Sequence, residues 1–204
     1  MPAKSSLSFL SLGDSYTIGE SVNESERWSV QLAQLLRSRG IDVKSPDIIA
    51  QTSWTTTELQ AAITASGNQQ QYELVSLLIG VNNQYRGQGI GLYQTGFRAL
   101  LQTAIRFAGN RPARVLVLSI PDWGASPYAV SRDRTTIATQ IDAFNAVARA
   151  ECNQAGVAFV DITPLTRQAT GDATQFASDG LHYSEKQMNQ WAEKALPVAE
   201  GMLK

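Results

Sequence analysis

The stretch Leu10-Ser11-Leu12-Gly13-Asp14-Ser15-Tyr16 begins with an apolar run that ends at a glycine, and an acid and a hydroxyl residue follow that glycine directly. The start of this run is the end of a strand predicted over Leu7–Ser11. A glycine at the end of a strand permits a tight turn, and the backbone amides after it can point at a developing anion. Taken alone, Gly-Asp-Ser is also ordinary turn composition. Its meaning therefore depends on what the rest of the chain supplies.

Apolar, β-branched runs of this kind recur between helix-length segments. The expected strands are Leu7–Ser11, Val43–Ala50, Leu74–Ile79, Arg114–Ile120 and Val157–Val160. The expected helices are Trp28–Arg39, a second opening at the capping-box spacing Thr55-Thr56-Thr57-Glu58, Leu92–Phe107, Thr135–Ala155, and a last one from Ser184 to about Ala195, before Pro197. This alternation predicts an α/β fold, a three-layer α/β/α sandwich with a mostly parallel five-stranded sheet, as one domain over residues 1–204.

Composition narrows the class of protein. Apolar residues make up 43% of the 204 positions and charged residues 17%, which is typical of a globular chain. A net charge of −1 gives no reason to expect a nucleic-acid partner. The apolar runs are too short for integral membrane association, and the N-terminus lacks a signal-peptide core, so a cytoplasmic location is expected. Oligomeric state cannot be inferred from these features.

Cys152 is the only cysteine, which rules out an internal disulfide and a cysteine-based metal cluster. It falls among alanines and valines in a predicted helix. A free cysteine in such a setting behaves as a small hydrophobe. We therefore expect Cys152 to be a buried packing residue and not a nucleophile.

The only histidine, His182, stands in Ser178-Asp179-Gly180-Leu181-His182-Tyr183. A hydroxyl nucleophile needs a base that titrates near neutral pH, and histidine is the side chain that does so without help. Asp179 precedes His182 by one turn, so its carboxylate can hold one ring nitrogen and leave the other for the nucleophile. A histidine bonded to a local acid is also common in proteins without such chemistry.

Gly80-Val81-Asn82-Asn83 directly follows the predicted third strand. A side-chain amide is a neutral donor that can stabilise an oxyanion. An asparagine turn that merely ends the strand is equally compatible with this motif alone. Ser15, Asn82 and the Asp179–His182 pair nevertheless follow strands whose carboxyl ends meet at one sheet edge, where open α/β sheets bind ligands.

Together these segments resemble the SGNH hydrolases, also called GDSL-type esterases and lipases. The segment around Gly13-Asp14-Ser15 is similar to the family's nucleophile block, Gly80-Val81-Asn82-Asn83 to its Gly-x-Asn-Asp block, and Asp179-Gly180-Leu181-His182 to its Asp-x-x-His block. The resemblance extends from Phe9 to Tyr183. It implies a flavodoxin-like three-layer fold, a catalytic triad of Ser15, Asp179 and His182, and no metal or cofactor.

The chain departs from that family in its second block. The family places there a glycine whose backbone amide completes the oxyanion hole, and in Gln51-Thr52-Ser53-Trp54-Thr55-Thr56 we align Trp54 with it. The resemblance then implies an oxyanion hole made by the Ser15 and Trp54 amides and the Asn82 side chain. Asn83 replaces an aspartate, which we interpret as structural.

Aromatic residues of the same loops form the candidate substrate pocket. Tyr85 and Trp123 are the expected substrate-binding residues, with Trp54 and Tyr128 nearby, although such side chains can equally pack against the sheet edge. The resulting hypothesis is a serine esterase that forms an acyl-enzyme and hydrolyses a small acyl ester or a lysophospholipid-like substrate. The alternatives are a carbohydrate O-acetyl esterase or thioesterase of the same fold, a non-catalytic binding module, and a flavodoxin-like nucleotide domain.

Overall fold

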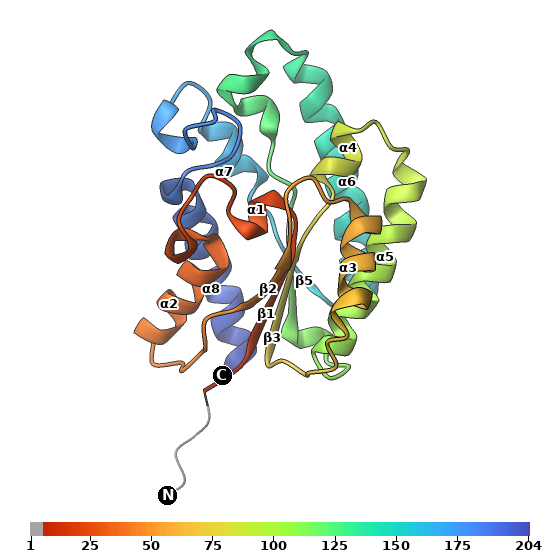
Figure 1. The fold of residues 1–204 in the computed structure, drawn as a ribbon, viewed down its shortest axis with the longest axis vertical. Helices are drawn as coiled ribbons and strands as arrows, with labels where there is room; N and C mark the ends of the chain where they lie inside the picture. The colour runs from red at the N-terminus through yellow and green to blue at the C-terminus, as the bar shows by residue number, and fades with distance from the viewer. Residues whose placement is uncertain (1–5) are drawn as a thin grey trace, which may run out of the picture.

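The computed structural model describes residues 6–204 as five strands covered by helices on both faces (Figure 1). The sheet is parallel throughout, in the order β2-β1-β3-β4-β5. The strands are β1 (Phe9–Gly13), β2 (Asp47–Ala50), β3 (Leu74–Leu78), β4 (Val115–Leu118) and β5 (Ala158–Val160). The three-layer α/β/α architecture expected from the sequence is confirmed, and the sheet is wholly rather than mostly parallel.

Helices α2 and α8 cover one face of the sheet, and α3, α5 and α6 cover the other (Figure 1). The helices are α1 (Ser15–Ile18), α2 (Trp28–Ser38), α3 (Thr56–Ser66), α4 (Val81–Tyr85), α5 (Ile90–Phe107), α6 (Arg134–Ala155), α7 (Thr163–Gln168) and α8 (Glu185–Leu203). Short 3₁₀ turns lie at Glu24–Glu26, Pro112–Arg114, Trp123–Ala125, Pro127–Ser131 and Ala173–Gln175. Both faces of β1 and β3 are fully buried as a result.

Local sequence signals explain where these helices begin and end. Thr55 caps α3, and its capping box with Glu58 forms as the spacing predicts. Gly156 ends α6 in the left-handed conformation that glycine adopts most readily. Cys152 is buried in α6, and burial raises the pKa of its thiol to about 12, so the expected packing role is confirmed.

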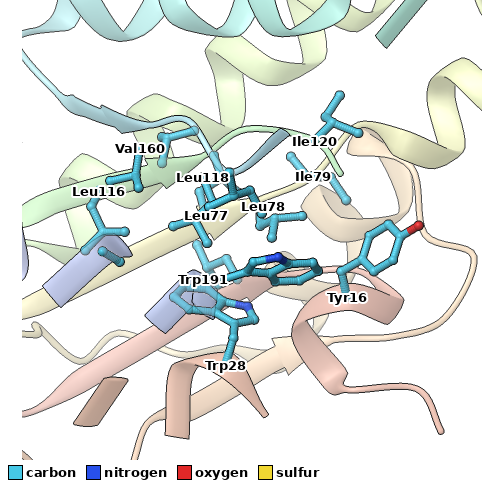
Figure 2. Close-up of a cluster of buried hydrophobic side chains, with 14 of the residues drawn as sticks. Tyr16, Trp28, Leu77, Leu78, Ile79, Leu116, Leu118, Ile120, Val160 and Trp191 are labelled. Carbon is cyan, nitrogen blue, oxygen red and sulfur yellow. The ribbon is translucent and has the colours of Figure 1, made fainter. Parts of the chain in front are cut away.

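Aromatic side chains fill the core beneath α1. Trp28 of α2 and Trp191 of α8 are fully buried, and the ring of Tyr16 lies 6.0 Å from that of Trp191 (Figure 2). Leucines and isoleucines of the strands and their ends complete this cluster, as Figure 2 shows. Segments from both ends of the chain thereby support the turn that follows β1.

Most predicted ends differ from the observed ones by one or two residues, and two differ by more. The strand expected over Val43–Ala50 begins only at Asp47, because Pro46 has no backbone amide to donate to a neighbouring strand. Val43 makes one isolated bridge to Leu7. The last helix does not end before Pro197 but continues to Leu203. Leu196 and Ala199 are buried on either side of the proline, and their packing outweighs the lost hydrogen bond.

Three short helices, α1, α4 and α7, lie in segments predicted as loops, and the first two bear on the site. The first, α1, starts two residues after β1, and α4 starts three residues after β3. Both are too short to show a helical hydrophobic period. They carry Ser15 and Asn82, so they determine how those two side chains are presented.

Gly13 occupies a position that no other residue fits. A Cβ there would lie 2.1 Å from Thr17 Oγ1 and 2.5 Å from the carbonyl oxygen of Leu78. The backbone of β1 therefore approaches both β3 and α1 more closely than any side chain allows.

We expect Gly13→Ala to destabilise the protein by about 1–3 kcal/mol or more, because the added methyl overpacks a site walled partly by backbone. Thermal unfolding followed by circular dichroism measures the loss. Gly201→Ala, where a Cβ meets nothing within 4 Å, is the matched control and should leave the melting temperature unchanged or slightly higher. A Gly13→Ala protein as stable as wild type would contradict the close approach.

Candidate active site

A cavity of about 260 Å³ opens at the carboxyl ends of β1 and β3. Residues far apart in the sequence meet on its wall: Ser15, Tyr16, Thr52, Ser53, Val81, Asn82, Tyr85, Trp123, Leu181 and His182. Ser15, Asn82 and His182, the polar candidates from three separate motifs, are among them. Residues 52, 53, 81 and 181 carry no chemical signal that would have marked them as lining residues.

Ser15 is the first residue of α1 and is 5% exposed. Asp14 caps this helix, with its Oδ1 accepting a hydrogen bond from the Tyr16 amide at 3.0 Å. Within the described part of the chain, no protein group accepts a hydrogen bond from the Ser15 amide. That N–H is therefore free to serve an anion at the cavity.

His182 and Asp179 form the hydrogen-bonded pair that their spacing predicts. His182 Nδ1 lies 2.7 Å from Asp179 Oδ2, while Asp179 Oδ1 accepts from the backbone amides of Leu181 and His182 at 2.9 Å each. Partial burial raises the pKa of Asp179, but the hydrogen bonds from the His182 ring and these amides outweigh it and lower that pKa to about 2. An ionised carboxylate only accepts, so Nδ1 carries the proton and Nε2 of the neutral ring is left as a base.

Asn82 lies on α4 with its amide group partly fixed. Its Nδ2 donates to the carbonyl oxygen of Trp54 at 2.9 Å. A side-chain amide has two N–H groups, so the second remains for the cavity that Asn82 lines. The neighbouring Asn83 bonds to the backbone and side chain of Thr56 instead, which fits the structural role expected for it.

The structure contradicts the oxyanion role expected for the Trp54 amide, because that amide is already hydrogen-bonded. The Trp54 amide donates to the Gln51 carbonyl at 3.3 Å, and its side chain packs against the core and not on the cavity wall. Ser53 lies on the wall and has a φ of 72°, the left-handed conformation that favours glycine. Ser53 therefore has the place on the cavity wall and the backbone conformation expected of that glycine. The sequence carried a signal for this turn. The capping box at Thr55 fixes the start of α3, so the turn must lie before it, over Gln51–Trp54.

Of the aromatic candidates, Tyr85 and Trp123 lie on the cavity wall, whereas Tyr128 does not. The rings of Tyr85 and Trp123 are 5.2 Å apart and edge to face. Trp123 is buried and donates to Gln84 Oε1 at 2.8 Å, so its ring is fixed. Tyr85 is 49% exposed, and its hydroxyl lies 3.0 Å from that of Tyr128. The cavity thus has one rigid and one solvent-facing aromatic wall.

Comparison with known proteins identifies the family of this chain. Residues 11–188 match the model of the GDSL-like Lipase/Acylhydrolase family, so the chain belongs to that family and is an ester hydrolase. A search of curated proteins found no match.

Several solved structures share the fold. The crystal structure of TesA superposes with a TM-score of 0.74 at 23% identity, covering 96% of this chain and 99% of that one. A lipase/acylhydrolase from Enterococcus faecalis gives 0.70 at 19% identity, with 97% of each chain covered. The psychrotrophic esterase EstA from Pseudoalteromonas sp., inhibited by monoethylphosphonate, gives 0.67 at 15% identity, covering 95% of this chain and 97% of that one. At these identities the likeness establishes the fold.

None of the helices within residues 6–204 has the length and apolar character needed to cross a bilayer.

Asp14, next to the nucleophile candidate, is buried in an unusual state. It is fully buried, and no donor within residues 6–204 reaches its Oδ2. Burial raises the pKa of Asp14 from 3.8 to about 7, against the opposing hydrogen bond from the Tyr16 amide. Ionising this carboxyl near neutral pH places an incompletely solvated charge directly behind Ser15.

We expect Asp14→Asn to reduce the pH dependence of stability. With a raised pKa in the folded protein, Asp14 contributes stability fully below about pH 4, and the contribution is lost as the pH rises through about 7. The interval from 3.8 to about 7 corresponds to roughly 4 kcal/mol. Asparagine keeps the acceptor for the Tyr16 amide and cannot ionise. Urea unfolding of both proteins at about pH 4.5 and about pH 8 tests this, and equal losses in the two proteins would contradict it.

Proposed function

We propose that the protein hydrolyses carboxylic esters through a Ser15-His182-Asp179 triad and an acyl-enzyme. His182 Nε2 takes the proton of Ser15 Oγ as that oxygen attacks the ester carbonyl, and the same proton passes to the leaving alkoxide. Water activated by His182 then attacks the acyl carbon and frees Ser15. The observation that carries the proposal is the 2.7 Å contact of His182 Nδ1 with Asp179, on a histidine that shares its cavity with Ser15.

The tetrahedral intermediate carries negative charge on the former carbonyl oxygen. We assign its donors as the Ser15 amide, the Ser53 amide and the second N–H of Asn82, all from residues on the cavity wall. The first belongs to the nucleophile itself. The other two come from the loop before α3 and from α4, so all three are fixed by the fold before substrate binds.

The size and lining of the cavity favour a small acyl group. Its volume of about 260 Å³ lies below the roughly 300–1,000 Å³ of sites for drug-sized ligands. Val81, Leu181 and Trp123 give it apolar wall. A short-chain acyl ester fits this space best, and a longer chain would have to extend past the exposed ring of Tyr85. A panel of acyl esters of graded length, with lysophospholipid, thioester and acetylated-sugar members, tests the choice. A preference for long chains would contradict it.

Ser15→Ala should abolish ester hydrolysis while leaving the protein folded, because it removes the nucleophile. The expected loss in kcat is on the order of 10⁴-fold or more. A fluorophosphonate probe should label the wild-type protein on Ser15 and fail to label the variant. Ser38→Ala, at an exposed site on α2, is the control and should behave as wild type. A folded Ser15→Ala protein with normal turnover would show that another group attacks.

Asn82→Ala should lower kcat by roughly 10²–10³-fold, since one oxyanion donor is lost and the triad remains. KM should change little because the donor acts mainly in the transition state. Initial rates over a range of substrate concentrations separate the two constants. Weakened binding with normal turnover would instead make Asn82 a ground-state substrate contact.

A further inference from the structure

The backbone turn that carries Ser53 is held in a conformation that serine disfavours. The Trp54 amide bonds to the Gln51 carbonyl, which closes a four-residue turn with Thr52 and Ser53 at its centre. Ser53 has a φ of 72°, and Thr52 is not among the residues with positive φ. This combination defines a type II turn, whose third position is normally glycine or asparagine.

The turn type determines where the Ser53 N–H points. Type I and type II turns differ mainly by a flip of the central peptide group. Here that group joins Thr52 to Ser53, and it contains the amide assigned above to the oxyanion. If Ser53 relaxed to a negative φ through such a flip, its N–H would point in the opposite direction. The donor role assigned to this amide therefore depends on the strained conformation.

Arg86, the C-terminal cap of α4, forms a hydrogen bond to this turn. Arg86 donates through Nη2 to the carbonyl oxygen of Ser53 and through Nη1 to Glu58 Oε1, the latter at 2.8 Å. Glu58 Oε2 in turn accepts from the Thr55 amide at 2.6 Å. The guanidinium thus bridges the strained residue to the capped start of α3. The Ser53 side chain makes no hydrogen bond of its own within the described residues, so it does not secure the turn.

Glu58 stays negatively charged at any pH well above its lowered pKa. Slight burial raises the pKa of Glu58, but the hydrogen bonds from Arg86 and Thr55 outweigh it and lower that pKa to about 2. An ion pair exposed to this degree contributes little to global stability. Because Arg86 also bonds the Ser53 carbonyl oxygen, we infer that the pair acts on the conformation of this turn.

We propose that Arg86 is a positioning residue that keeps Ser53 in its left-handed conformation and so keeps the Ser53 N–H directed at the oxyanion. This proposal rests on the esterase function proposed above. It makes the bond from Arg86 to the Ser53 carbonyl, and not the ion pair with Glu58 alone, the feature that supports turnover.

Kinetics of Arg86→Met in two backgrounds test the proposal. In the wild-type background kcat should fall by about tenfold or more, toward the roughly 10²–10³-fold cost of one lost oxyanion donor, with KM little changed. In the Ser53→Gly background the same substitution should cost no more than about threefold, because glycine adopts a positive φ without support. A comparable loss in both backgrounds, or no loss in either, would overturn the proposal.

Arg111→Met is the matched control. Arg111 is 41% exposed against 40% for Arg86, pairs with Glu73, and donates to the carbonyl of Tyr72. Arg111 precedes β4, at the amino ends of the strands and away from the cavity. Its substitution should leave kcat unchanged. A loss with Arg111→Met equal to that with Arg86→Met would make the effect one of general stability and overturn the positioning role.

A crystal structure of Arg86→Met gives a readout that does not depend on activity. We expect Ser53 to adopt a negative φ in it, with the Thr52–Ser53 peptide flipped, and to keep its positive φ in Arg111→Met. A positive φ retained in Arg86→Met would overturn the proposal even if the protein is an esterase. Conversely, an inactive wild-type protein with the flip in Arg86→Met would refute the esterase and leave the support of the turn by Arg86 intact.

Discussion

The close pairing of β1 with β3 is the constraint on which the site depends. Gly13 lies opposite Leu78 in the parallel register, and the absence of a side chain lets the two backbones and α1 come together. Because both strands end at the same edge, the short helices that follow them start at that edge. Ser15 and Asn82 are brought to one cavity in this way, although 66 residues of chain separate them. A wider spacing at Gly13 would move the nucleophile away from the oxyanion donor.

Two carboxylates near Ser15 show how surroundings divide the same chemistry. Asp179 receives hydrogen bonds on both oxygens, from the His182 ring, two backbone amides and the hydroxyl of Ser21, so its pKa is low and it stays charged. Asp14 is more deeply buried and has one unsatisfied oxygen, so its pKa is high. The first is suited to hold a protonated imidazole during catalysis. The second caps the turn and stays neutral only below about pH 7.

The sequence by itself determined the layers, the parallel sheet and the approximate bounds of its main elements. Buried strands such as Leu74–Leu78 are continuous apolar runs, and helices such as α6 end at glycine, so both signals are local. The pair Asp179–His182 was also predictable, because three residues of spacing bring the two side chains together in a single turn. Where a feature depends on neighbours in the chain, reading the chain was sufficient.

Only the tertiary structure decided how the oxyanion site is built. Sequence alignment placed the second-block donor at Trp54, but the turn closed by its amide puts Ser53 on the cavity wall. The bond from Arg86 to the Ser53 carbonyl joins segments 33 residues apart, and no local pattern announces it. The last helix likewise runs through Pro197, since burial against the sheet exceeds what helix propensity alone indicates. These features arise from packing between distant segments, and a one-dimensional pattern carries no record of such contacts.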